Sequence, residues 1–344
     1  MTPARPLGRA FVCALVSAFV LGFALPGAAA AEDLREIRVG FMKGGLPIVV
    51  KARHALEDHF AARGIAVKWV EFSVGPPLVE ALVAGRLDFG ATGNTPPIFA
   101  QSAGASLAYV AVSGPHASGA GILVAKNAPL RTLADLKGKR VGICKGSAAQ
   151  NLAIVALAKA GLSYDDITPV YLSPSDSSAA FVSGQIDAWP TWDPFYTLAQ
   201  KTAGARVLID AEEVEPTYAF LLANGALAKA HPDIVGEVTQ VLDEVAHWAD
   251  AHRAEVVELS TAATGLPVDV ERDIVARSRF GIDPVSEAAL VAQQAVADRF
   301  AELKLIPKPI HVRDAVWTPP AAPVSPTPTL ADTASQGARP NESR

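Results

Sequence analysis

One strand–helix pattern occurs twice in the chain, and this repeat restricts the folds that the chain can adopt. The first copy is Arg38-Val-Gly-Phe-Met-Lys-Gly-Gly45 and the second is Arg140-Val-Gly-Ile-Cys-Lys-Gly-Ser147. Each copy has the residues of a buried strand, then a glycine turn, then a helical segment. A second pair of segments, 80–88 and 179–187, places a helix end, a glycine and a strand start in the same order. Two copies of one plan predict two similar α/β lobes.

Each copy leads into a helix, which we expect over 46–63 in the first case and 148–160 in the second. A helix N-terminus has free N–H groups and a partial positive charge, so it attracts anions. In the second copy, Gly146 permits a sharp turn, Ser147 is the expected N-cap residue, and Lys145 adds a charge. Ligands of open α/β sheets bind outside the carboxyl ends of the strands. Two such ends facing each other would form a cleft with an anion site on each wall.

Strand and helix signals alternate along the rest of the chain, as in α/β folds. The expected strands cover 36–41, 67–72, 87–92, 107–113, 122–125, 141–144, 170–172, 187–192, 206–210 and 218–223. Further helices are expected over 76–84, 95–104, 133–139, 174–183 and 194–203, and from 226 to 300 the pattern is helical with breaks at proline and glycine. The segment 318–344 is rich in proline, alanine, serine and threonine and is expected to be disordered.

The N-terminal 31 residues have the pattern of a cleaved signal peptide. Arg5 and Arg9 precede an apolar run from Phe11 to Leu25, and small residues follow up to Ala31. A retained membrane anchor is the alternative, but the apolar run is short for one. Cys13 lies inside the apolar run and not at its exit, so we do not expect a lipid anchor.

Composition limits the classes of partner. The chain has 344 residues, of which 50% are hydrophobic and 19% charged, which suffices for two sizeable lobes. Its formal net charge of −5 argues against a general binder of nucleic acid or anionic membranes. A small anionic ligand remains possible, because the local positive potential at one helix N-terminus, and not the net charge of the chain, determines whether it binds. Cys144 is the remaining cysteine beyond the signal peptide, so no internal disulfide is expected, and no histidine spacing indicates a metal site.

With these residues in view, the chain resembles the periplasmic solute-binding proteins of ABC importers. Its motifs are similar to those of the aliphatic sulfonate-binding branch, which is related to the taurine and nitrate binders. The resemblance covers 36–315 and rests on the segments 40–45, 71–76, 88–97, 135–139, 145–147 and 192–195. It implies a type II-like two-lobed fold with two crossings between the lobes, near 122–126 and 219–224. Lobe one would then comprise 36–123 and 224–317, and lobe two 124–223.

The resemblance also implies a function. The protein would capture a small organic anion, an aliphatic sulfonate, in the cleft between the lobes and pass it to an ABC permease in the inner membrane. A partner ATPase would supply the energy, and this chain has no G-x-x-x-x-G-K-[ST] motif of its own. A periplasmic monomer without cofactor, metal or catalytic activity is expected. The alternatives are a taurine, nitrate, aromatic sulfonate or sulfate ester binder, and a cofactor-biosynthesis enzyme on the same fold.

The two helix starts provide candidate ligand-binding residues. Beyond the Gly146 turn, Ser147 could donate its hydroxyl to a sulfonate oxygen, with the N–H of Ala148 beside it. From lobe one, Thr95 could donate a hydroxyl and Asn94 an amide. Gly93 would let the backbone approach the ligand. Two prolines follow Thr95 and remove N–H donors, so capping alone is an equal alternative there.

Charged and aromatic residues near these loops have two readings each. Lys43 and Lys145 could pair with the anion or remain solvated, in which case the N–H groups of Gly44 and Gly45 are alternative donors. Trp192 could cover the alkyl part of the ligand or lie in the core.

Asp193 could meet the ammonium group of an aminosulfonate, by the resemblance to the taurine binders. The local sequence favours a different role, as the N-cap residue of a helix with Pro194 at its first position.

Overall fold

The strands form two sheets of five strands each in the computed structural model, which describes residues 34–116 and 119–320. The first sheet has the order β2-β1-β3-β10-β4. Its strands are β1 (Glu36–Phe41), β2 (Ala66–Glu71), β3 (Phe89–Gly93), β4 (Leu107–His116) and β10 (Thr217–Asn224). β1 pairs parallel with β2 and β3, whereas β10 runs antiparallel between β3 and β4.

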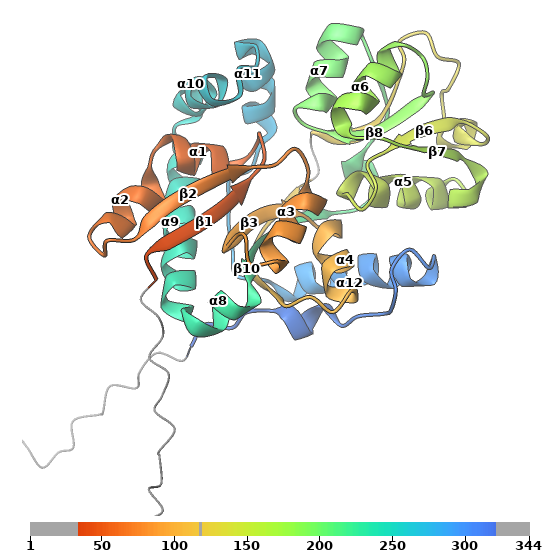
Figure 1. Ribbon diagram of the computed structural model, residues 1–344. Coiled ribbons are helices and arrows are strands. Elements are labelled where there is room, and N and C mark those ends of the chain that lie inside the picture. The colour runs from red at the N-terminus through yellow and green to blue at the C-terminus, as the bar shows by residue number, and fades with distance from the viewer. Residues whose placement is uncertain (1–33, 117–118, 321–344) are drawn as a thin grey trace, which may run out of the picture. The chain divides into compact units, whose positions relative to one another are not determined.

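The second sheet repeats this topology with other strands. Its order is β7-β6-β8-β5-β9 (Figure 1). Its strands are β5 (Ala120–Val124), β6 (Arg140–Ile143), β7 (Thr168–Tyr171), β8 (Ala188–Trp192) and β9 (Arg206–Asp210). β6 pairs parallel with β7 and β8, and β5 runs antiparallel between β8 and β9. The predicted α/β fold with two similar halves is confirmed.

The chain passes between the sheets at other residues than those predicted. It leaves the first sheet after β4 and enters the second at β5, and it returns between β9 and β10. The segment 120–123, assigned to lobe one from the sequence, therefore belongs to the second sheet, and 217–223 belongs to the first. Each sheet thus receives its antiparallel strand, β5 or β10, immediately after a crossing, which local sequence signals do not reveal.

Twelve α-helices and four 3₁₀ helices connect the strands in the described residues. The α-helices are α1 (Leu46–Ala52), α2 (Ala55–Ala61), α3 (Gly75–Val83), α4 (Thr95–Ser102), α5 (Ala148–Lys159), α6 (Pro174–Val182), α7 (Phe195–Ala203), α8 (Gly225–Ala230), α9 (Pro232–Ala251), α10 (Arg253–Thr264), α11 (Val268–Arg277) and α12 (Glu287–Glu302). The 3₁₀ helices are η1 (Leu133–Leu136), η2 (Tyr164–Asp166), η3 (Ala211–Glu213) and η4 (Val312–Ala315).

The helix predicted over 46–63 is wrong as a single element. The structure breaks it into α1 and α2 at His54, whose φ of 54° is left-handed. Such a conformation costs a non-glycine residue free energy. Leu56 and Phe60 of α2 are fully buried in the same apolar cluster as Val49 of α1, so packing of both pieces offsets that cost.

Helices cover both faces of each sheet. In the first half, one apolar cluster joins the sheet to α1, α2, α8 and α9, and another joins it to α3, α4 and α12 (Figure 1). In the second half, α5 packs on one face and α6 with α7 on the other. Ile154 of α5 belongs to the α3–α4–α12 cluster, so this helix packs on both halves.

An arginine–aspartate pair fixes the repeat in each half. Arg38 donates to Asp88 from its backbone N (2.7 Å), Nε (2.9 Å) and Nη2 (2.7 Å). Arg140 donates to Asp187 from the same three atoms at 2.8, 3.1 and 2.8 Å. Each arginine also donates to the carbonyl oxygen of the glycine that follows the helix before its aspartate, Gly85 in the first half and Gly184 in the second. The sequence repeat is therefore a structural repeat.

Two predictions from the sequence concern residues that the structure does not describe. The predicted signal peptide, and the predicted tail from 321 onward, lie outside the described residues. Within 34–116 and 119–320, no helix is both long and apolar enough to cross a membrane.

Candidate ligand-binding site

The predicted site residues lie at the carboxyl ends of four parallel strands. Lys43, Gly44 and Gly45 follow β1, and Gly93 ends β3, with Asn94 and Thr95 after it. In the second half, 145–148 follows β6, and Trp192 ends β8 with Asp193 after it. This is the edge at which ligands bind in open α/β sheets.

The β6–α5 loop is held by internal hydrogen bonds. Gly146 has a φ of 73°, which favours glycine, and its N–H donates to Oε1 of the buried Gln150 at 2.7 Å. Ser147 is the N-cap residue, as predicted, but its side chain caps no N–H group. Its hydroxyl instead donates to the carbonyl oxygen of Cys144 at 2.7 Å. These internal hydrogen bonds fix the geometry of the loop.

The donors left at the start of α5 are backbone groups. In the described part of the chain, no hydrogen bond uses the N–H of Ala148 or Ala149, whereas the N–H of Gln150 bonds Ser147 at 3.0 Å. Gly93 of the first half lies directly opposite, since a Cβ placed on it would be 3.1 Å from Cβ of Ala148. The structure therefore brings the ends of β3 and β6 together, from two different sheets.

The β3–α4 loop is held from below by α12. The buried Gln293 donates from Nε2 to the carbonyl oxygen of Asn94 at 2.6 Å. The hydroxyl of the fully buried Thr95 donates to Oδ1 of Asn94 at 2.9 Å. Asn94 is the N-cap residue of α4, and within the described residues its Nδ2 has no hydrogen-bond partner. Nδ2 is therefore the side-chain donor that this loop retains.

The lysine and glycine loop after β1 is exposed. Nζ of Lys43 lies 3.6 Å from Oε1 of Glu71, and both side chains are half exposed. The N–H of Gly44 donates to the carbonyl oxygen of Met42 at 2.8 Å, so this predicted donor is already used. Gly45, with a φ of 70°, is the N-cap residue of α1. On the other loop, the exposed Lys145 lies over the ring of Tyr171 at 5.7 Å.

The N-cap role expected for Asp193 needs correction. The N-cap residue of α7 is Pro194, and the helix begins at Phe195. The Asp193 carboxylate nevertheless accepts from the N–H of Thr197, the third residue of α7 (3.1 Å), and from its hydroxyl (2.5 Å). The carboxylate also accepts from Arg277 at the end of α11.

Arg277, Gln150 and Gln293 were not found from the sequence. Arg277 donates to Asp193 from Nε at 3.0 Å and from Nη2 at 2.9 Å, although 84 residues separate the two. Gln293 lies 199 residues from Asn94. Partners so far apart in the sequence leave no local pattern. Gln150 lies four residues after Gly146, one helical turn, so its spacing was a signal that the sequence did contain.

Burial affects the titration of two groups in this region. Burial raises the pKa of the Asp193 carboxyl, while the hydrogen bonds from Thr197 and the charge of Arg277 act in the opposite direction. Burial also raises the pKa of the Cys144 thiol, against a smaller opposite effect of Ser147. Among the residues at 34–116 and 119–320, no three His, Cys, Asp or Glu side chains are grouped to hold a metal ion.

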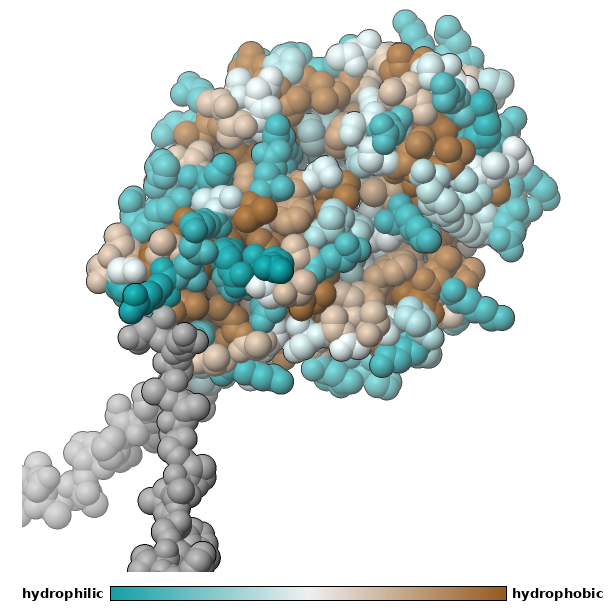
Figure 2. Space-filling model, viewed as in Figure 1, coloured by the Kyte–Doolittle hydropathy of each residue, from teal (hydrophilic) through white to brown (hydrophobic). Residues whose placement is uncertain are grey.

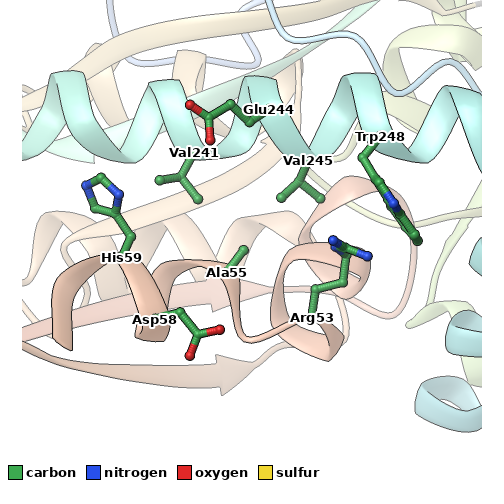
Figure 3. Close-up of a pocket in the computed structure, with 8 residues that line it drawn as sticks. All are labelled: Arg53, Ala55, Asp58, His59, Val241, Glu244, Val245 and Trp248. Atoms are coloured by element: carbon green, nitrogen blue, oxygen red, sulfur yellow. The ribbon is translucent and has the colours of Figure 1, made fainter.

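A hollow elsewhere does not involve the predicted residues. It measures ≈ 290 Å³ and lies between α2 and α9, where Arg53 stacks over Trp248 at 3.6 Å (Figure 3). His59 and Val241 line its other end. Over the face seen in Figure 2, hydrophilic and hydrophobic residues alternate. Neither the hollow between α2 and α9 nor this surface lies where the ends of two strands meet, as they do at Gly93 and Ala148.

Two sheets of one topology, with loops meeting between them, define the two-lobed fold of periplasmic binding proteins. The family described as NMT1/THI5 like matches residues 55–256. An aliphatic sulfonates-binding protein of Escherichia coli (strain K12) is 40% identical over 295 residues, which cover 85% of this chain and 92% of that protein. The chain belongs to the NMT1/THI5-like family and is a homologue of aliphatic sulfonate-binding proteins.

Two crystal structures show the same relationship. The periplasmic aliphatic sulphonate binding protein SsuA from Escherichia coli aligns with a TM-score of 0.76 and 38% identity, over 82% of this chain and 97% of that chain. The alkanesulfonate-binding protein SsuA from Xanthomonas axonopodis pv. citri, bound to MOPS, aligns with a TM-score of 0.78 and 40% identity, over 82% and 98%.

Proposed function

We propose that the protein is the periplasmic binding component of an ABC importer and that it binds an aliphatic sulfonate. The observation that carries the proposal is the meeting of Gly93 with Ala148, at the start of α5, where two N–H groups have no hydrogen-bond partner among the described residues. A sulfonate oxygen carries part of a negative charge and accepts well from such N–H groups. The identity to sulfonate-binding homologues supports the same ligand class.

The proposed site has a wall from each half. Ala148 and Ala149 donate their N–H groups from one wall, and the Gly146–Ser147 turn, held by its own hydrogen bonds, positions them. From the other wall, Nδ2 of Asn94 donates and Gly93 gives the ligand room. Trp192 covers the alkyl part. We assign 36–116 and 217–317 to lobe one and 120–210 to lobe two, an assignment that the strand orders of the two sheets support. Closing of the lobes completes the site.

We place the protein in the periplasm as a monomer, exported through the signal peptide at 1–31 and without a lipid anchor. It delivers the ligand to a permease driven by a separate ATPase. An enzyme on this fold is the second reading, and Cys144 would be its natural nucleophile. That thiol is buried and its pKa is raised by burial, which disfavours the reactive thiolate. Binding without catalysis is therefore favoured.

Calorimetric titration of the purified protein tests the proposal, after bound ligand has been removed by unfolding and refolding. The panel is ethanesulfonate, octanesulfonate, MOPS, benzenesulfonate, an aryl sulfate ester, taurine and nitrate. We expect one-to-one binding of at least one alkanesulfonate and no binding of nitrate. A protein that refolds but binds no sulfonate would contradict the proposal, and so would turnover of any panel member.

A further inference from the structure

We propose that a row of polar contacts between α7 and α11 holds the two lobes closed and separates when they open. We call this row the α7–α11 ladder. Its residues are Asp193, Thr197 and Lys201 on one side and Arg277, Asp273 and Asp269 on the other. The inference goes beyond the proposed function, because it concerns residues outside the proposed ligand site. It rests on that function only in that closed lobes retain a ligand.

The residues of the ladder recur at every fourth position on both sides. Position 193 lies just before α7, and positions 197 and 201 follow on the helix, where residues four apart are neighbours. On α11 the positions 269, 273 and 277 have the same spacing. Position 193 contacts 277, whereas 201 contacts 269 and 273, so the two rows pair in opposite directions. The sequence therefore contains two rows of complementary charge.

One end of the ladder lies beside the first crossing between the sheets. Arg277 donates to Oδ2 of Asp193 from Nε at 3.0 Å and from Nη2 at 2.9 Å, and it also donates to the hydroxyl of Thr197. The N–H of Asp193 donates to the carbonyl oxygen of Gly119, the residue before β5, at 2.8 Å. This end is thus packed against the chain at the place where the lobes can turn.

The other end of the ladder is two helical turns away from that crossing. Nζ of Lys201 lies 2.9 Å from Oδ2 of Asp269 and 2.8 Å from Oδ2 of Asp273. Lys201 comes eight residues after Asp193, which is about 12 Å along a helix. A turn of the lobes about the crossing therefore moves Lys201 farther than Asp193. The two aspartates are 56% and 48% exposed, so water can solvate these charges once they separate.

The two helices can separate without exposing an apolar core. Val275 of α11 belongs to the apolar cluster of the first half, whereas Tyr196 and Ala199 of α7 belong to a cluster of the second half (Figure 1). Within the described residues, none of the apolar clusters contains members of both helices. The opposite flank differs, because Ile154 of α5 packs into the cluster around α12. This asymmetry places the opening movement at the α7–α11 flank.

Contacts that exist only in the closed state strengthen ligand binding, because the apparent dissociation constant falls as the closed fraction rises. An exposed ion pair contributes about twofold to fivefold to such an equilibrium, and the two pairs of Lys201 together contribute about tenfold. Contributions of this size allow the lobes to reopen. The ladder therefore supports closing and still permits release of the ligand.

Charge reversal at Lys201 tests the ladder. Lys201→Glu places a third acid beside Asp269 and Asp273, so the dissociation constants of ethanesulfonate and octanesulfonate should rise about tenfold. The exchange variant Lys201→Glu/Asp269→Lys/Asp273→Lys restores opposite charges and should return both constants to within about threefold of wild type. Lys229→Glu, at an exposed position of α8, changes the net charge equally and should leave the affinity unchanged.

A distance measurement tests the movement without depending on the ligand. Nitroxide labels on Val70→Cys of lobe one and Val182→Cys of lobe two, both at exposed positions, report the separation of the lobes, and the native Cys144 is buried. We expect Lys201→Glu to shift the distance distribution toward longer values, with and without ethanesulfonate. The exchange variant should reverse this shift.

An unchanged distance distribution in Lys201→Glu would overturn the role of the ladder. An exchange variant that binds as weakly as Lys201→Glu would overturn it as well, because the loss would then not come from the charges. A wild type that binds no sulfonate would instead overturn the proposed function, and the labelled distances would still decide the role of the ladder. The two failures are therefore distinguishable.

Discussion

Backbone N–H groups are the main donors that the start of α5 offers to a ligand. The hydroxyl of Ser147 donates to Cys144, and Lys145 is exposed over Tyr171. Ala148 and Ala149 have no such internal partners within the described residues. A sulfonate is a weak base that spreads its charge over three oxygens, so several fixed N–H donors suit it better than one mobile ammonium group.

Ala148→Pro removes one of these donors without removing the helix. Proline is tolerated at the first helical position, and Ser147 has the extended conformation that a residue before proline prefers (φ −95°, ψ 166°). We expect the dissociation constant for the bound sulfonate to rise about tenfold, which is the loss of one hydrogen bond to a charged group. Titration calorimetry measures this change.

Ala148→Val is the matched control, because valine adds similar volume beside Gly93 and keeps the N–H. Urea unfolding of both variants shows whether the fold is retained. Equal losses of affinity in the proline and valine variants would mean that crowding, and not the missing donor, is responsible.

Gln293 is expected to stabilise the loop that carries Asn94. Two prolines follow Thr95, and Gln293 supplies the hydrogen bond to the Asn94 carbonyl. Gln293→Met keeps the volume but leaves this carbonyl unpaired, which should lower the free energy of unfolding by about 1–3 kcal/mol. Urea unfolding measures the loss. Gln240→Met, which breaks only an exposed hydrogen bond within α9, should change stability little, and equal losses in both variants would contradict the role of Gln293.

The strands and their repeat were predictable because their signals are local. Alternating or apolar runs gave the strands within a few residues, and the paired segments at 80–88 and 179–187 predicted one plan for both halves. The Arg38–Asp88 and Arg140–Asp187 contacts within that plan were not predicted. The break at His54 was not predictable, because packing against α9 decides it. The same holds for the sheet to which β5 and β10 belong, since their pairing partners lie far along the chain.

The α10–α11 pair contains a buried acid whose effect depends on pH. Glu271 is only 3% exposed and accepts from the Thr264 hydroxyl at 2.6 Å. Burial, as the largest effect, raises the pKa of this carboxyl above its usual value. A raised folded-state pKa favours folding below the unfolded pKa, and this contribution is lost as pH rises through the folded pKa.

Glu271→Gln removes the titration and keeps an oxygen for Thr264. The stability of the variant relative to wild type should therefore increase between pH 4 and pH 7, where the wild type must hold a buried charge. Urea unfolding across this range measures the difference. Glu258→Gln, at an exposed position of α10, is the control. A difference for Glu271→Gln that stays constant or decreases with rising pH would contradict the argument.

At the scale of the whole molecule, a three-residue network joins the halves near the second crossing. Arg299 of α12 donates to Glu215 at 3.0 Å and to Asn151 of α5 at 2.6 Å. Asn151 in turn donates to Glu215 at 2.5 Å. Glu215 lies between β9 and β10, where the chain returns to the first sheet. Together with Ile154 in the α12 cluster, the network fixes α5, and hence its N-terminal donors, to the first half.

A double-mutant cycle on Arg299→Met and Glu215→Gln measures how strongly this network holds. Both side chains are only 23% exposed, so water screens their attraction less than at a surface. We expect a coupling free energy of about 1–2 kcal/mol in urea unfolding, within the range for contacting charged residues. The same cycle on Arg313 and Glu287, whose side chains are 65% and 68% exposed, should give a coupling near zero. If the two cycles agreed, the Arg299–Glu215 contact would be an ordinary surface pair. The position of the α5 donors would then depend on apolar packing around Ile154 alone.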